Sequence, residues 1–214
     1  MSSPPEHPRG RKRDADATRT ALLDAARELF GRHGYEAVTL RDIGERAGAD
    51  GSLIARYFGS KAALYRSAVA EDSRDAAAPA EGLELRPYTV GSLQRADLRG
   101  APGPLVQALL SRGGAAEVRG AAADEIRTRL VEPLAAGLSA EGADDPEAGA
   151  ELLVACLVGV IALRTSGHFD ALARTSPDVV GAVLESAAHA YTTEAPRASG
   201  AHERPGPRGS ASSV

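Results

Sequence analysis

Apolar residues recur along this chain at helical spacing, and strand-like alternation of apolar and polar residues appears nowhere over any length. The first apolar set follows the spacing i, i+4, i+7, i+8, which defines one face of a helix, and consists of Leu22, Ala26, Leu29 and Phe30. We expect this helix to run from about Thr18 to Gly34, since glycine suits the left-handed position at which many helices end. The pattern therefore predicts an all-α protein.

Two short helices separated by a glycine are predicted next. Helix 39–47 should open at Thr39, because Asp42 three residues later completes an acidic variant of the capping box. Gly48 can adopt the positive φ that a tight turn requires, and a second short helix is expected at 50–57. Two short helices joined in this way form a helix-turn-helix, whose second helix enters the major groove of DNA.

Helical periodicity continues, with interruptions, toward the C-terminus. Residues 75–103 are the least regular part, with one helix expected near 89–99. Pro133 removes one backbone hydrogen bond and should kink the helix that contains it. Ser60 should cap a helix at the start of this region, and the later helices are expected at about 104–112, 117–139, 147–164 and 178–192.

Two of these helices carry more apolar surface than one subunit can cover. The run from Leu152 to Leu163 has no polar face, and a helix that is apolar all round is buried all round. The apolar residues of 178–192 are similarly spread. We predict a homodimer through helices near 148–165 and 178–192, forming a two-fold four-helix interface, although a central helix in a monomeric bundle is the alternative. A run of twelve is shorter than the roughly 20 residues of a membrane span, so no membrane partner is expected.

Charge is unevenly distributed along the 214 residues, whose net charge is −4. Residues 1–66 hold 12 Lys and Arg against 9 Asp and Glu, whereas the remaining residues hold 13 against 20. A mildly basic N-terminal part permits an anionic partner there. The single Cys156 excludes a disulfide framework and a multi-cysteine zinc site, and no secretory signal is evident, so we expect a cytoplasmic protein without a metal.

Catalytic motifs are missing from the sequence. No histidine follows a glutamate at the Glu-x-x-His spacing of di-iron bundles, and there is no Gly-x-Ser-x-Gly and no P-loop. The sequence therefore predicts a protein that is not an enzyme, has no catalytic residues and uses no cofactor.

Residues 19–65 resemble the DNA-binding head of the TetR-type bacterial transcriptional regulators. The resemblance rests on Ala-Ala-x-x-Leu-Phe in the first helix, the Gly-Tyr that follows, Thr39, Ala47-Gly48 and Tyr57-Phe58-x-Ser-Lys61. It implies an all-α fold in which an N-terminal three-helix helix-turn-helix DNA-binding head stands on a larger helical ligand-binding and dimerisation body. The expected parts are a disordered basic arm at 1–16, the DNA-binding domain at 17–62, the ligand-binding and dimerisation domain at 63–194 and a disordered tail at 195–214.

The resemblance also implies roles for matching residues. Thr39, Tyr57 and Lys61 match positions that contact phosphates, while Ser52, Leu53 and Arg56 stand where base edges are read. Many members carry an aromatic residue where this chain has Ala55 and a histidine where it has Tyr57, so no member's operator sequence is transferred here. The basic cluster of Arg11, Lys12 and Arg13 is either a solubilising tail or an arm that enters a minor groove.

These observations favour a homodimeric transcriptional repressor that binds an inverted-repeat double-stranded DNA operator and is released by an unidentified small-molecule effector. The alternative is an architectural or ligand-independent DNA-binding protein. Cys156, Arg164 and His168 are weak candidates for ligand contact, since a core cysteine, a helix-end arginine and a solvated histidine explain them equally well.

Overall fold

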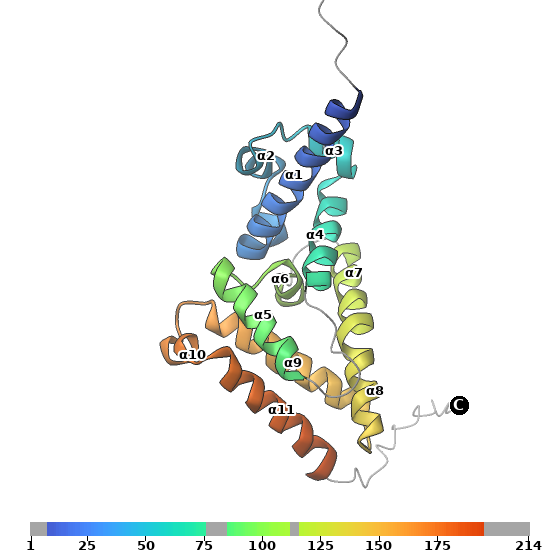
Figure 1. Ribbon diagram of the computed structural model, residues 1–214, viewed down its shortest axis with the longest axis vertical. Coiled ribbons are helices and arrows are strands. Elements are labelled where there is room, and N and C mark those ends of the chain that lie inside the picture. Colours follow the sequence, from blue (N-terminus) through green and yellow to red (C-terminus); the bar gives the residue numbers. More distant parts are fainter. Residues whose placement is uncertain (1–7, 76–84, 112–115, 195–214) are drawn as a thin grey trace, which may run out of the picture.

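The computed structural model describes residues 8–75, 85–111 and 116–194, and in this part of the chain all regular structure is helical. Figure 1 shows an elongated molecule with the N-terminal helices at one end. They form a head that comprises α1 (Pro8–Ala37), α2 (Leu40–Ala47) and α3 (Leu53–Phe58). Helix α4 (Lys61–Asp75) runs from this head into the remaining helices, which we call the body. The predicted all-α class is confirmed.

The body is a bundle in which α11 lies along α5 and α9 packs against α8, α11 and the segment before α8 (Figure 1). Its elements are α5 (Leu85–Arg99), α6 (Pro104–Leu110), α7 (Ala116–Ile126), a π-helical segment η1 (Arg127–Val131), α8 (Glu132–Ala140), α9 (Pro146–Arg164), α10 (Asp170–Arg174) and α11 (Pro177–Glu194). Helix α6 also packs against α1 and α4, so the body contacts the head directly.

Helix α1 begins ten residues before the expected start at Thr18. Residues 8–16 are therefore helical, which corrects the expectation that they are disordered, while residues 1–7 and 195–214 lie outside the described residues. Pro8 occupies the first helical position, where its missing N–H is not needed, and the residues that follow include good helix formers such as Arg, Lys and Ala. The helix is interrupted at Gly34, where φ is 76°, close to its expected end.

The helix expected at 117–139 is divided into three parts. The π-helical segment η1 ends just before Pro133, which stands in the first turn of α8. Proline has no N–H to donate to the carbonyl four residues earlier, so the hydrogen-bond ladder widens there. The irregularity predicted at Pro133 thus takes the form of a π turn.

Helix α9 is long and apolar enough, by length and composition, to cross a membrane, with a mean hydropathy of 1.8 over its most apolar stretch. One side of it is nevertheless part of the bundle, since Leu153 and Leu157 are buried in the core. Its opposite side is exposed. The helix therefore serves both the interior of the body and an outer surface.

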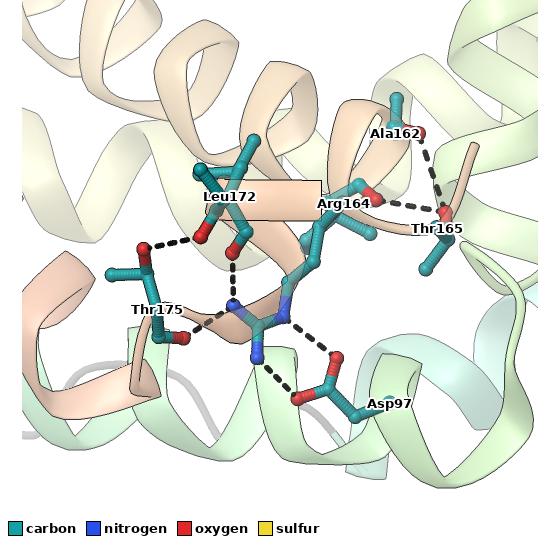
Figure 2. A network of polar contacts seen from close by, with 8 residues as sticks. Asp97, Ala162, Arg164, Thr165, Leu172 and Thr175 are labelled. Atoms are coloured by element: carbon teal, nitrogen blue, oxygen red, sulfur yellow. Dashed lines mark hydrogen bonds and ion pairs between the residues drawn. The ribbon is translucent and has the colours of Figure 1, made fainter. Parts of the chain in front are cut away.

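The end of α9 is fixed to two other elements by Arg164, whose side chain is buried (Figure 2). Its Nε and Nη2 donate to the two carboxylate oxygens of Asp97 on α5, at 2.7 and 2.9 Å. Its Nη1 donates to the backbone carbonyls of Leu172 and Thr175, at 2.7 and 2.5 Å. The bidentate pair joins α9 to α5, and the two carbonyl contacts join α9 to the short α10 and the residue that follows it. Helix α10 itself was not predicted from the sequence.

Candidate functional site

Helix α2 begins and ends as predicted. The N–H of Asp42 donates to Thr39 Oγ1 at 3.2 Å, and the N–H of Thr39 donates to Asp42 Oδ2 at 2.8 Å, which completes the capping box. The hydrogen bond from the Thr39 backbone lowers the pKa of Asp42, because it favours the charged carboxylate. The contact with the Thr39 side chain lowers it further, by a smaller amount. At the other end, Gly48 adopts φ 65° and ψ 30°, the left-handed conformation of a helix cap.

The turn between α2 and α3 packs against α2 through two glycines. A Cβ atom on Gly44 would lie 2.7 Å from the backbone nitrogen of Gly51, and one on Gly51 would lie 2.7 Å from the carbonyl oxygen of Leu40. Both distances are shorter than real contacts, so only glycine allows this approach. Gly51 therefore lies against α2. The sequence contained one sign of this close approach, because Gly44 is a poor helix former that stands in the middle of a short helix.

Helix α3 has one buried and one exposed side. Ile54 is fully buried, whereas Ser52 and Arg56 are exposed and Leu53 is half-buried. The helix begins at Leu53 rather than at residue 50, because Asp50 Oδ1 accepts the N–H of Ser52 at 2.8 Å and forms a turn there. This arrangement anchors a short helix on the head and leaves its outer side chains available.

Two cation–aromatic contacts support the residues around α3. The guanidinium of Arg19 lies 5.0 Å from the ring centre of Phe58 and so joins α1 to α3. The guanidinium carbon of Arg56 lies 5.8 Å from the ring centre of Tyr57, which is half-buried. Arg19 carried no signal in the sequence that would have identified this contact.

Lys61 stands at the start of α4, beyond the cap formed by Ser60, whose Oγ accepts the N–H of Ala63 at 3.1 Å. Its Nζ lies 4.3 Å from the ring centre of Tyr35, and partial burial lowers the pKa of the lysine. Tyr35 in turn packs edge-on against Tyr65 of α4, with ring centres 5.1 Å apart. The Gly-Tyr pair was part of the recognised pattern, but its role as the support of Lys61 was missed.

The basic cluster lies in the first turns of α1. Arg11, Lys12 and Arg13 all belong to the helix, and Arg13 is exposed. The cluster is therefore carried on a helical extension of the head, well before the fully buried Leu22.

A cavity of about 490 Å³, including the part open to solvent, lies in the body between α4, α5, α6, η1 and α9. Its polar side chains all come from α4 and α5 and are Asp72, Tyr88, Ser92, Arg95 and Arg99. The four on α5 follow the spacing i, i+4, i+7, i+11 and so share one face of that helix. The opposite walls are aliphatic. Burial raises the pKa of Tyr88 to about 12.

Asp72 is buried at the edge of this cavity and contacts two further helices. Arg99 Nη2 of α5 lies 2.7 Å from Asp72 Oδ1, and the N–H of Leu105 in α6 donates to Oδ2 at 3.4 Å. Burial raises the pKa of Asp72, and the charge of Arg99 opposes that shift. This carboxylate is the point at which α4, α5 and α6 meet.

Helices α9 and α11 each leave apolar side chains exposed, and we call this set the α9–α11 face; its members are Leu152, Cys156, Leu163, Val179 and Val183. Val183 is 61% exposed and Leu152 is 57% exposed, whereas the adjacent Leu184 is only 6% exposed and belongs to the core. The two helices pack together, so the face is shared by neighbouring elements.

Two sequence profiles match this chain. The profile described as "Bacterial regulatory proteins, tetR family" matches residues 22–68, and that described as "Tetracyclin repressor-like, C-terminal domain" matches residues 90–191. The chain belongs to the TetR family of transcriptional regulators. The resemblance inferred from the head is thereby confirmed, and the second profile extends it over most of the body.

This chain spans less than two thirds of the length of the two curated relatives described here. The HTH-type transcriptional regulator UidR of Escherichia coli (strain K12) is 31% identical over 84 residues, which are 37% of this chain and 43% of UidR. The uncharacterised HTH-type transcriptional regulator YdeS of Bacillus subtilis (strain 168) is 30% identical over 127 residues, 58% of this chain and 62% of YdeS. The solved structure of Salmonella enterica GusR has the same fold, with a TM-score of 0.60 at 23% identity, covering 82% of this chain and 95% of GusR.

The three residues considered as ligand contacts in this TetR-family chain all lie outside the cavity lining. Cys156 is exposed on the α9–α11 face rather than buried in the core, because α9 turns only its other side toward the bundle. Arg164 is occupied by Asp97, and His168 is exposed after α9. Among the described residues, no three His, Cys, Asp or Glu side chains come close enough together to hold a metal ion.

Proposed function

We propose that this TetR-family protein is a homodimeric repressor that binds an inverted-repeat operator and is released by a small molecule. The observation that carries the proposal is the α2–turn–α3 unit, in which buried Ile54 anchors α3 while Ser52 and Arg56 remain exposed. A helix held in this way fits the major groove, where base edges differ for every base pair. Because a chromosomal operator lies in the bacterial cytoplasm, the proposal places the protein there.

Within the proposed complex, the residues around α3 divide into two roles. Ser52, Leu53 and Arg56 read base edges, with the guanidinium of Arg56 suited to the paired acceptors of guanine. Thr39, Tyr57 and Lys61 contact phosphates, a role that the support of Lys61 by the Tyr35 ring favours by fixing its position. The basic cluster on the first turns of α1 adds charge near the DNA backbone.

The homodimer forms through the α9–α11 face, the exposed part of helices near 148–165 and 178–192. Exposed valine and leucine side chains such as Val183 and Leu152 are covered when the same two helices of a second subunit pack against them. A two-fold axis then presents two α3 helices to one side of the duplex. Half-sites about one helical turn apart, roughly 34–36 Å, match this symmetry.

Ligand release follows from the contacts of α4, which carries Lys61 at its head end and Asp72 in the body. A molecule in the cavity changes the surroundings of Asp72 and Arg99, and Asp72 also holds the first turn of α6. The hydroxyl of Tyr65 on α4 donates to the carbonyl of Pro104 in α6 at 3.4 Å. A shift of α6 or α4 therefore alters the position of the head.

The proposal is tested by sequencing the DNA fragments that the purified protein retains, with and without extracts of small metabolites. We expect one inverted-repeat motif to be enriched, and its retention to be lost in an extract that contains the effector. Analytical ultracentrifugation of the bound complex should give two protein chains per motif.

The alternative, an architectural or ligand-independent DNA-binding protein, makes a different prediction. It would retain fragments without an enriched motif, and its specific and non-specific affinities would be nearly equal at every salt concentration. That result would reject the repressor, whereas an enriched motif that no extract releases would reject only the ligand response.

A further inference from the structure

The walls of the body cavity differ sharply in chemistry. Its polar groups are concentrated on α5 and at Asp72, while the facing walls consist of aliphatic side chains such as Leu105, Leu157 and Ile161. A cavity of this kind holds a ligand with one polar end and an apolar remainder. The charge of the polar wall then decides which polar end is accepted.

The charged groups of that wall do not cancel. Asp72 already has two partners, the guanidinium of Arg99 and the N–H of Leu105. Arg95 is half-buried, and within the described residues its hydrogen-bond partner is the neutral hydroxyl of Ser92, whose Oγ accepts from Nη2 at 3.0 Å. No carboxylate of the described residues forms an ion pair with it. The lining therefore has one positive charge more than it has negative charges.

Partial burial makes this excess charge significant. Burial lowers the pKa of Arg95 because it disfavours the charged guanidinium. The charge of Arg99 acts in the same direction, whereas Tyr88, Asp72 and Asp75 oppose the shift without outweighing burial. An arginine held away from water gains from a carboxylate, with which it can form two parallel hydrogen bonds. A cation in the same place would meet repulsion from two guanidinium groups.

A second, smaller space with a mostly aliphatic lining adjoins the cavity, and the apolar part of a ligand enters it only when the lining side chains move apart. Both are lined by Tyr88, Leu130, Val154 and Leu157, and the second measures about 270 Å³, including the part open to solvent. Thr89 lines this second space with its side chain fully buried, and within the described residues its hydroxyl has no hydrogen-bond partner. An alkyl chain offers this hydroxyl no hydrogen bond, so Thr89 adds nothing to the binding of the apolar part of a ligand.

We propose that the cavity is selective for small amphipathic carboxylates and that Arg95 binds the carboxylate group. This inference rests on the proposed function only in taking the cavity as the effector site. Arg95 is the anchor because Arg99 is engaged by Asp72, while the aliphatic walls and the adjoining space hold an alkyl or ring substituent.

The test compares three probes of equal chain length, octanoate, 1-octanol and octylamine, by isothermal titration calorimetry of the DNA-free protein. We expect octanoate to bind at least about tenfold more tightly than either of the others, since only the carboxylate pairs with Arg95. Equal or tighter binding of octylamine or 1-octanol overturns the proposal. So does the absence of binding by octanoate, decanoate and 4-phenylbutyrate alike.

Variants assign the contact to Arg95. We expect Arg95→Gln to weaken octanoate binding by at least about tenfold and Arg95→Lys, which keeps the charge, by about threefold. Arg86→Gln is the matched control, because Arg86 lies on the same helix with its side chain exposed and paired with Asp178 at 3.3 Å. Octanoate binding by Arg95→Gln at the parent's affinity overturns the assignment.

A measurement on the unaltered protein guards against a variant that does not fold. Phenylglyoxal modifies accessible arginines, and peptide mass spectrometry reports the rate at each one. Octanoate should slow the modification of Arg95 and leave Arg86 unaffected, whereas equal rates at Arg95 with and without octanoate contradict the proposal. Release of the protein from operator DNA is measured separately. If octanoate binds but does not release the DNA, only the proposed ligand response is rejected. If other molecules release the DNA while no carboxylate binds, only the inference about Arg95 is rejected.

Discussion

The head and the body of this protein differ in how completely one chain buries its apolar residues. In the head, large side chains such as Phe30, Ile43 and Ile54 are fully buried, and the helix ends are capped by neighbouring side chains. In the body, α9 and α11 leave valine and leucine side chains on the surface, and a cavity remains inside. The head is therefore complete in one chain, whereas the body leaves apolar surface and an internal cavity, which the proposed second subunit and ligand would fill.

The largest effect is expected where a charge enters the core of the body. Leu184→Asp should destabilise the monomer by several kcal/mol, because the carboxylate would be buried without a partner. Urea unfolding followed by circular dichroism measures this loss. Leu184→Met, which keeps an apolar side chain of similar size, is the control and should lose about 1.5 kcal/mol or less.

The adjacent residue separates folding from assembly. Val183 is exposed in the single chain, so Val183→Asp should leave the helical content unchanged while abolishing the dimer and weakening operator binding. Sedimentation at micromolar concentration measures the mass. His189→Asp adds the same charge to another exposed position of α11 and should remain dimeric. A Val183→Asp protein that stays dimeric and bound to DNA would remove the α9–α11 face from consideration.

This pair of residues also shows how far the sequence could be interpreted. The spread of apolar residues over 178–192 predicted an excess of apolar surface, but it could not decide whether Val183 or Leu184 faces outward. That choice depends on how α11 rotates against α5 and α9, which is set by packing between residues far apart in the chain. The structure resolves it, because only Leu184 is buried.

Local chemistry was predictable, and long-range pairing was not. The caps at Thr39, Gly48 and Ser60 depend on residues three or four positions apart and were all predicted correctly. Arg164 and Asp97 are 67 positions apart, and the sequence contained no signal of their pairing. The cavity likewise combines α4, α5, α6 and α9, so no single segment predicted its lining. The head could be inferred in detail because its contacts are mostly local and its motif is specific.

At the DNA-binding surface, the strongest expected effect is a loss of specificity. Arg56→Ala should cost about 1–3 kcal/mol at one base pair of each half-site, because a guanidinium paired with a base edge is lost there. Binding to unrelated sequences should change little. Arg74→Ala is the control, since Arg74 is exposed at the body end of α4 and pairs with Glu71. Sequencing of retained DNA measures the profile, and a profile identical to the parent's would show that Arg56 reads no base.

The smallest effect is expected from a phosphate contact. Lys61→Ala should weaken binding to all sequences alike and reduce the slope of log affinity against log salt by about one unit per subunit, because one fewer counterion is released. The Tyr35 ring holds this lysine, so Tyr35→Leu should give a weaker version of the same change while leaving the charge in place. Arg66→Ala removes a charge from an exposed position farther along α4 and separates the loss of a contact from the loss of net charge. Fluorescence anisotropy across a salt series measures the slopes. If Lys61→Ala keeps the parent's slope while Arg66→Ala lowers it, then the phosphate contact belongs to α4 beyond its first turn and the role assigned to Lys61 is wrong.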